Sequence, residues 1–386
     1  MGHLPSGASH TPRTETSFHP PGACLNEWGR LRPLESFGRA PPVSTPRCSA
    51  IERGPIFYDF GDAARKPSLT GVKQPEGPMN PTKTLAELKA LARQLPSRRV
   101  AVVRADEVET LTAVGEAVRA DMVEAVLIGP SKEIRACAEQ AGFDLNGIEI
   151  IECPDDPSSA LKGVEVIREG RADVLMKGLV ATSKFLHAIV DREHGIRGEG
   201  LLSHVGVFEV PTYHKLLIIT DAAMVIAPGL EDKVVLLRNA VTVANALGID
   251  RPKCTMVCAK EEPYDRMPRT LEAARLKEMA GQGLLGDVIF DAPLSLDLSV
   301  SMESVKIKKS QSPVAGDADV LLLPDIESGN ILYKSLIFLA GAELGAVVMG
   351  AKCPVVLTSR ADSAESKLCS IVLSGVVASF LGGGKA

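Results

Sequence analysis

The sequence predicts an α/β fold of two domains, built mainly from parallel sheets with helices on both faces. The chain has 386 residues, of which 45% are hydrophobic and 24% charged. It can therefore bury a substantial core, and its length favours two domains. From residue 79 onward, short β-rich runs alternate with segments of helical period. The β-rich runs are apolar almost throughout, as expected of parallel strands covered on both faces.

Composition excludes several classes of function. The 43 basic and 48 acidic residues give a net charge of -5, and no long basic run is present, so we expect a small-molecule partner and no nucleic acid. The eight cysteines form no CxxC pair, which favours reduced thiols and a cytoplasmic location. We find no run of about 18 to 20 apolar residues and no signal-peptide core, so we expect no membrane association.

Residues 1–78 differ in character from the remainder of the chain. They are rich in Pro, Ser, Thr, Gly and Arg, and no helical or alternating period persists in them for ten residues. This composition predicts a disordered extension, or a mis-assigned start with the true start at Met79.

The elements of the first α/β units follow in order. Leucines at helical spacing from Leu85 to Leu95 predict a first helix, which Pro96 ends. Strands and helices then alternate: the predicted strands are 99–105, 125–129, 148–152 and 173–177, and the predicted helices are 107–122, 131–142, 158–169 and one that begins at Thr182 or Ser183.

The alternation is interrupted over 201–228, where two or three strands follow one another. The later predicted elements are a helix at 231–247, a strand at 254–259, a helix at 269–280, an extended region at 287–300, a strand at 320–323, a helix after Asn330, strands within 345–350 and 353–359, and a final helix. The last units resemble the first ones. We therefore predict one domain from 79–205 plus 340–386 and an inserted second domain at 206–339.

The joint between the last strand and the last helix carries the first candidate site. Asp362, followed three residues later by Glu365, resembles a capping box, which predicts Asp362 as the N-cap. Arg360 is then unexplained, because a cation ahead of a helix meets the positive end of its dipole. An anion held by Arg360, Ser359 and Ser363 would explain it, and a solvated arginine is the alternative.

Two further joints have the same strand-to-helix topology. In the first, Asp325 ends a strand and Gly329 and Asn330 begin a helix, where they either bind a ligand or cap the turn. In the second joint, the candidates for an anion site are Lys177, Gly178, Thr182 and Ser183. This joint lacks the glycine spacing of a Walker loop.

Other candidate residues lie outside these joints. His204 is either a general base or a core histidine with satisfied hydrogen bonds. The lysines 306, 308 and 309 fit a solvated face or a phosphate contact. We predict no metal site, because Cys254 and Cys258 have no histidine near them in sequence.

Three segments together resemble the phosphate acetyltransferase and phosphate butyryltransferase family, with the butyryltransferase branch closer. They read "DAAMVIAPGLEDKVVLLRNAVTVANALGI", "SPVAGDADVLLLPDIESGNILYK" and "PVVLTSRADSAESKL". The resemblance extends from Met79 to the C-terminus.

The resemblance implies a reversible reaction in which acyl-CoA and phosphate give acyl phosphate and CoA, by direct attack in a ternary complex. It implies two domains of the isocitrate and isopropylmalate dehydrogenase type with the active site in the cleft between them. CoA is then a substrate, no cofactor is required, and the chain forms a homodimer or a higher homo-oligomer.

The resemblance also implies site residues. Ser359 and Arg360 match a serine and an arginine of the acetyl branch, but the aspartate proposed there as the base falls at or near Ser366. We therefore expect Asp362 to be the base. The alternatives are a CoA or acyl-phosphate sensor without activity and a dehydrogenase of the same fold, although we find neither the aspartate cluster nor the adenosine loop of the latter.

Overall fold

The structure is a computed structural model that describes residues 80–198, 200–359 and 362–382. The predictions for residues 1–78 and for Arg360 therefore lie outside the described residues. Within this range the chain folds as α/β units, as predicted.

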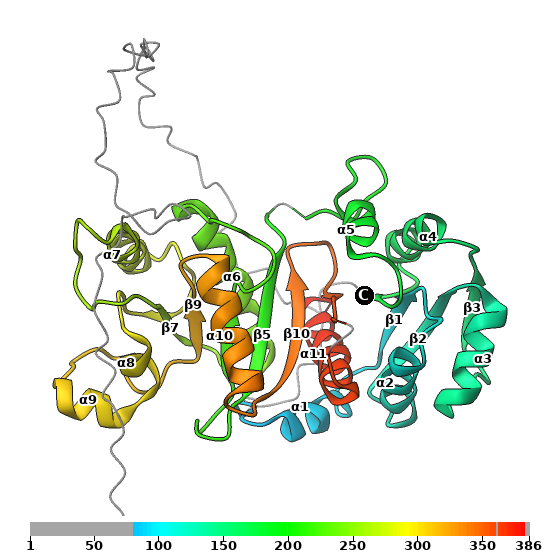
Figure 1. Cartoon of the computed structure of the whole chain (residues 1–386), viewed down its shortest axis with the longest axis horizontal. Helices are drawn as coiled ribbons and strands as arrows, with labels where there is room; N and C mark the ends of the chain where they lie inside the picture. The colour runs from blue at the N-terminus through cyan, green and yellow to red at the C-terminus, as the bar shows by residue number, and fades with distance from the viewer. Residues whose placement is uncertain (1–79, 199, 360–361, 383–386) are drawn as a thin grey trace, which may run out of the picture. The chain divides into compact units, whose positions relative to one another are not determined.

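The strands of the described chain form one mixed sheet in the order β3-β2-β1-β4-β11-β10-β5-β6-β9-β7-β8 (Figure 1). Most neighbours are parallel; β10 runs antiparallel to β5 and β11, and β5 antiparallel to β6. The strands are β1 (Arg98–Val103), β2 (Val123–Gly129), β3 (Glu149–Glu152), β4 (Val174–Lys177), β5 (Ser203–Glu209), β6 (Leu217–Thr220), β7 (Lys253–Met256), β8 (Ile289–Phe290), β9 (Val320–Leu322), β10 (Glu343–Met349) and β11 (Val355–Val356).

Helices cover both faces of the sheet, as the unbroken apolar strands predicted. They are α1 (Leu85–Ala92), α2 (Val108–Arg119), α3 (Ser131–Ala141), α4 (Asp156–Arg168), α5 (Thr182–Val190), α6 (Leu230–Ala246), α7 (Pro268–Gly281), α8 (Leu296–Val300), α9 (Met302–Lys308), α10 (Ile326–Phe338) and α11 (Ala364–Gly382).

The central strand β10 shows how the two faces are separated. Val347 and Met349 enter the core that packs against α1, α2, α3, α6, α7 and α11. Leu344, Ala346 and Val348 point to the opposite face, because side chains alternate along a strand. There, Leu344 and Ala346 join the cluster of α8 and α10, and Val348 joins the cluster of α4 and α5. The second face thus carries two separate apolar clusters that meet over β10.

One prediction from the sequence was wrong for the segment before β9. The region predicted as extended, 287–300, contains only the two-residue strand β8 and then the helix α8. Leu294 and Leu298 are both buried in one cluster, and their spacing of four fits a helical turn as well as a strand. Of the nearby lysines, Lys306 and Lys308 lie on α9 and Lys309 follows it; Lys308 pairs with Glu261 and Asp297 at 2.9 and 3.0 Å.

Among the described helices, α11 is the one long and apolar enough to cross a membrane by length and composition. Its 19 residues have a mean hydropathy of 1.5, so length and composition alone would permit a span. Its apolar window is 72% buried inside the fold, against β10 and β1. A buried core helix passes the same test, so this is weak evidence for a membrane span.

The division into two domains stays a prediction. Its first boundary, between residues 205 and 206, falls inside β5, and the sheet continues from β10 through β5 to β6.

Candidate active site

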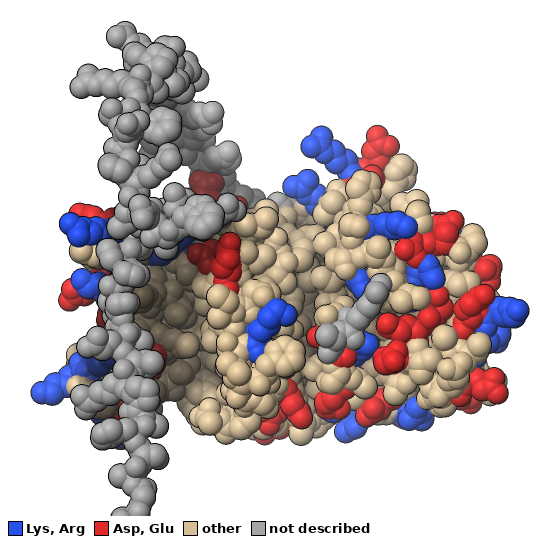
Figure 2. All heavy atoms as spheres, viewed as in Figure 1, with Lys and Arg blue, Asp and Glu red and all other residues tan. Residues whose placement is uncertain are grey.

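A pocket of about 560 Å³ opens on the face of the sheet where the two apolar clusters meet. We call it the His204 pocket. Its sides are α10 and the start of α5, and the segment that follows β11 closes it. Figure 2 shows that charged side chains crowd this side of the molecule over α2, α3 and α4, whereas few lie over α10.

The structure brings six of the predicted site residues together in this pocket, although they come from four separate segments. They are Thr182, His204, Asn330, Ser359, Asp362 and Ser363. Five predicted residues do not line it: Lys177, Gly178, Ser183, Asp325 and Gly329.

His204 lies on β5 opposite Val348 and is only 5% exposed. Its backbone N–H donates to Asp221 Oδ2 at 3.1 Å. Its ring atom Nδ1 is enclosed and has no hydrogen-bond partner among the described residues. Burial lowers the pKa of His204, and the charges of Asp221 and Asp362 only partly oppose this effect. The imidazole is therefore neutral at pH 7.

Tyr333 of α10 packs against the histidine ring. Its ring meets His204 edge-on at 5.5 Å between centroids and Phe208 at 5.2 Å. Gly206 lies between His204 and Phe208 on β5. A Cβ at Gly206 would lie 2.8 Å from the Phe208 ring and 3.6 Å from the Tyr333 ring. Burial, together with the charge of Asp362, raises the pKa of Tyr333. Its hydroxyl therefore stays protonated and can donate a hydrogen bond.

The loop before α11 corrects the predicted N-cap. Ser363 Oγ accepts from Ser366 N at 3.1 Å and caps the helix, while Asp362 Oδ2 accepts from Ser359 N at 2.7 Å. Glu365 is not the reciprocal partner, because it pairs with Lys89 at 2.5 Å. Aspartate and serine are comparably good caps, so the sequence offered two adjacent candidates. Asp362 instead closes the turn in front of the helix.

The start of α10 is fixed by contacts to the segment that follows β6 and by its own cap. Asp325 caps the helix by accepting from Ser328 N at 3.0 Å. Gly329 has no room for a side chain, because a Cβ would lie 2.1 Å from the backbone oxygen of Asp221. Asn330 Nδ2 donates to Ala222 O at 3.1 Å. These residues seat α10 against the segment that also holds the backbone of His204.

The joint after β4 is also tightly packed. Lys177 is 6% exposed, and its Nζ donates to Gly178 O at 3.1 Å. A Cβ on Gly178 would lie 2.2 Å from Arg104 O, so this glycine allows the close approach of two backbones. The roles predicted for Lys177, Gly178 and Ser183 in substrate binding stay predictions.

The sequence reasoning missed Tyr333, Lys334 and the apolar wall of the pocket. That wall is formed by Ile337, Phe338, Ala342, Leu344 and Leu357. Tyr333 and Ile337 follow Asn330 by three and seven residues, so they share its helical face, and this spacing could have revealed them. The remaining wall residues come from later segments and carry no such signal.

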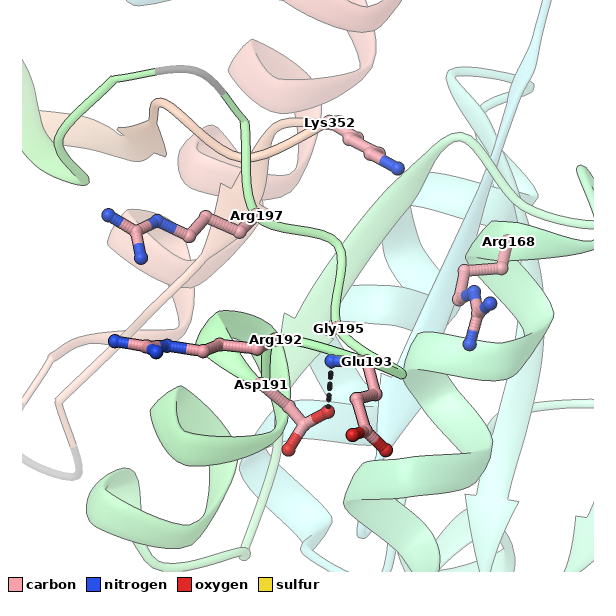
Figure 3. A pocket seen from close by; sticks show the side chains of 7 residues that line it. All are labelled: Arg168, Asp191, Arg192, Glu193, Gly195, Arg197 and Lys352. Atoms are coloured by element: carbon pink, nitrogen blue, oxygen red, sulfur yellow. Dashed lines mark hydrogen bonds between the residues drawn. The ribbon is translucent and has the colours of Figure 1, made fainter.

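A second pocket of about 390 Å³ is lined by charged side chains, and we call it the arginine pocket. Its lining residues are Arg168, Asp191, Arg192, Glu193, Gly195, Arg197 and Lys352. Figure 3 shows Arg192 and Arg197 extending to one side, away from Arg168 and Lys352. Asp191 accepts from the backbone N–H of Glu193 at 3.0 Å, drawn as a dashed line. All four cations are exposed, and they do not converge on one point.

The chemistry available in the His204 pocket is more specific. It combines a neutral imidazole, serine and threonine hydroxyls, the carboxylates Asp362 and Glu343 and the cation Lys334 with an apolar wall. Such a pocket can accept a proton and bind an anion beside a short apolar group.

Comparisons with known proteins agree with the resemblance seen in the sequence. A family model described as "Phosphate acetyl/butaryl transferase" matches residues 156–374, more than half of the chain. The chain belongs to this family. The similar family members include both phosphate acetyltransferases and phosphate butyryltransferases.

The phosphate butyryltransferase of Clostridium acetobutylicum is 40% identical over 296 residues, which cover 77% of this chain and 98% of the relative. The phosphate acetyltransferase of Thermotoga maritima is 42% identical over 294 residues, covering 76% and 99%. Among solved structures, a branched-chain phosphotransacylase from Enterococcus faecalis is 31% identical, with a TM-score of 0.66, and covers 73% of this chain and 99% of that one. The matched fold is thus that of a phosphotransacylase.

Proposed function

We propose that this family member is a phosphate acyltransferase, which transfers a short-chain acyl group reversibly between CoA and inorganic phosphate. The observation that carries the proposal is the His204 pocket, in which an unpaired imidazole and several hydroxyls face an apolar wall. The reacting groups meet there in a ternary complex, and the thiolate attacks the acyl carbon directly.

Phosphate binds at the loop between β11 and α11. Ser359 lies in the pocket wall there, and Thr182 begins α5 across from it. The N-terminus of α11 supplies backbone N–H groups and a favourable dipole for an anion. Arg360, whose structure is not described, supplies the guanidinium in this proposal and stabilises the charge that grows on the leaving phosphate.

The acyl chain lies against the apolar wall formed by α10 and the start of β10. Ala342 and Leu344 are buried at this end of the pocket, and Ile337 is half-buried. These side chains favour an acyl group of about four carbons over acetyl, since each methylene that enters an apolar pocket adds roughly 1 to 3 kcal/mol of discrimination. We propose butyryl-CoA or a branched relative as the preferred substrate.

The test is to follow thiol release from butyryl-CoA with phosphate present and absent, and then to repeat it with acetyl- and propionyl-CoA. The proposal predicts release that requires phosphate, with the highest kcat/KM for the four-carbon chain. Phosphate-independent release, or none, would reject it. Tight CoA binding without turnover would instead identify a binding protein.

We also propose that the enzyme is a cytoplasmic homodimer that needs no cofactor. Ile331 and Phe338 of α10 and Leu339, which follows the helix, are 67%, 72% and 84% exposed, which is unusual for large apolar side chains that lie together. Light scattering will show a particle of twice the chain mass if this face is an interface. Activity that survives dialysis against a chelator supports the absence of a metal cofactor.

A further inference from the structure

We propose that His204 takes the proton from the CoA thiol and passes it to the departing phosphate. This inference rests on the proposed function. It assigns the proton acceptor to the histidine of β5, whereas the sequence favoured Asp362.

The first argument is the unsatisfied hydrogen-bonding capacity of the ring. Four enclosed side-chain atoms lack a hydrogen-bond partner among the described residues: His204 Nδ1, Thr220 Oγ1, Asn245 Oδ1 and Ser374 Oγ. His204 is the one of these four residues that lines the pocket. A buried polar atom without a partner costs about 1 to 3 kcal/mol, so such atoms commonly mark functional positions.

The second argument is the charge around the ring. Asp221, which is 2% exposed, holds the backbone of His204, while Asp362 and Tyr333 face it across the pocket and Lys334 lies on the same wall. The neutral ring has a lone pair with which to accept a proton. Once the imidazolium forms, the charges of Asp221 and Asp362 stabilise it. The site therefore supports both states that a general base must visit.

The third argument concerns the candidates beside the histidine in the loop before α11, which are already engaged; the remaining carboxylate, Glu343, lies exposed at the start of β10. Asp362 Oδ2 already accepts a hydrogen bond from Ser359 N at 2.7 Å, so this oxygen closes the turn before α11. Ser366, at the position where the resemblance places an aspartate, has no carboxylate, and its hydroxyl is paired with Ser363 Oγ at 3.1 Å.

The proposed step balances in atoms and charge. In the direction of acyl-CoA synthesis, His204 removes the S–H proton and the thiolate attacks the carbonyl carbon of the acyl phosphate. The C–S bond forms and the C–O bond to phosphate breaks. The imidazolium then returns its proton to the leaving phosphate oxygen, which gives hydrogen phosphate and neutral His204. The reverse reaction uses the same proton in the opposite order.

The main experiment is to replace the histidine and measure acyl-CoA formation from butyryl phosphate and CoA. His204→Gln keeps a polar side chain of similar size but has no titratable nitrogen. We expect kcat to fall about 100- to 10,000-fold, with CoA binding by calorimetry changed less than threefold. The matched control is His214→Gln, because His214 is exposed and pairs with Asp317 at 2.8 Å outside the pocket. We expect its activity to stay within twofold of wild type.

The pH profile separates proton transfer from mere packing. Burial lowers the pKa of His204, so the wild-type rate should stay level from pH 8 down to about 6.5, the ordinary value for histidine. In His204→Gln only thiol that is already ionised reacts, so the rate should rise about tenfold per pH unit until the thiol pKa of about 8.5. The wild-type measurement needs no variant, so it tests the proposal even if His204→Gln does not fold.

Three results would overturn the inference. One is a wild-type rate that already falls below pH 8. A second is a folded His204→Gln that keeps the wild-type rate at pH 7. The third is a rate that rises about tenfold per pH unit in Asp362→Asn instead of in His204→Gln, which would make Asp362 the base. A wild-type protein without phosphate-dependent thiol release would reject the proposed function itself, whatever the variants do.

Discussion

The His204 pocket and the arginine pocket differ in how their charged groups meet the solvent. The arginine pocket has four cations, but all are exposed and two pairs of them extend in different directions (Figure 3). Solvent and salt screen such charges strongly. The His204 pocket has fewer charges, yet it encloses an unpaired imidazole between a carboxylate, an aromatic ring and an apolar wall. Enclosure therefore favours the His204 pocket as the candidate active site, although the arginine pocket has more cations.

Two arginines, Arg360 and Arg197, provide the largest predicted difference. The proposed function assigns Arg360 to the leaving phosphate, so Arg360→Ala should lower kcat about 100- to 1,000-fold. Arg197→Ala, in the arginine pocket, should stay within twofold of wild type. Phosphate-dependent thiol release measures both. Equal losses in the two variants would contradict the distinction between the pockets.

The close contact between Gly329 of α10 and Asp221 provides the next largest predicted effect, a loss of stability and activity. Gly329→Ala places a Cβ 2.1 Å from the backbone oxygen of Asp221, and overpacking of this kind costs roughly 1 to 3 kcal/mol. We expect a lower free energy of unfolding in urea and a loss of activity, since α10 forms one side of the His204 pocket. Gly281→Ala is the control, because Gly281 ends α7 with open space around its Cα. If the two variants are equally stable, the contact at Gly329 is not limiting.

The apolar wall predicts a change of substrate preference. Ala342→Leu fills space at the acyl end of the pocket, so kcat/KM for butyryl-CoA should fall about tenfold relative to acetyl-CoA. Competition between the two substrates gives this ratio directly. The same substitution at Ala340, which is exposed and does not line the pocket, should leave the ratio unchanged. A proportional loss with both substrates would place the acyl chain elsewhere.

The smallest predicted effect is on stability and concerns two carboxylates that accept backbone N–H groups, Asp325 near the His204 pocket and Asp191 in the arginine pocket. Hydrogen bonds from Ser328 lower the pKa of Asp325 despite its partial burial, and N–H groups of His194 and Glu193 lower that of Asp191. Because the folded-state pKa of Asp325 is depressed, its stabilisation is present above about pH 4 and is lost as the pH falls further.

Asp325→Ala should therefore cost about 1 kcal/mol of stability at pH 7 and little at pH 2, whereas Asp325→Asn should keep most of the cap. Asp191→Ala should not affect activity, because Asp191 supports only its own loop. Urea unfolding at the two pH values measures the first effect. A constant cost at both pH values would show that the charge of Asp325 is not responsible.

Much of the fold was predictable because it is encoded locally. Apolar runs gave the strands, and helical periods gave most helices, including α6 and α10. The errors arose where two local solutions were nearly equal, as at Ser363 against Asp362 for the cap of α11. The short segment 287–300 was ambiguous for the same reason, since one helical turn and a strand can bury the same leucines.

The site was only partly predictable because it is assembled across the sheet. His204, Tyr333 and Asp362 are far apart in sequence, and no periodicity links β5 to α10 or to the loop before α11. The sequence could mark His204 as a candidate, but its unpaired ring nitrogen depends on packing against Tyr333 and Asp221. Asp325 and Gly329 position the start of α10 and do not line the pocket, so their predicted role in substrate binding stays a prediction.

Two parts of α10 contact different parts of the His204 pocket: its middle contacts the histidine, and its last turn lines the acyl end. Its first turn is locked to the segment that carries Asp221, through Gly329 and Asn330, and its middle holds Tyr333 over the histidine ring. Its last turn, with Ile337 and Phe338, lines the acyl end of the pocket and is farther along the helix from the histidine than Tyr333 is. During evolution, substitutions in the last turn can therefore change the accepted chain length without disturbing the proton acceptor. Relatives with acetyl and butyryl preferences can arise from one ancestor by this route while the chemistry is preserved.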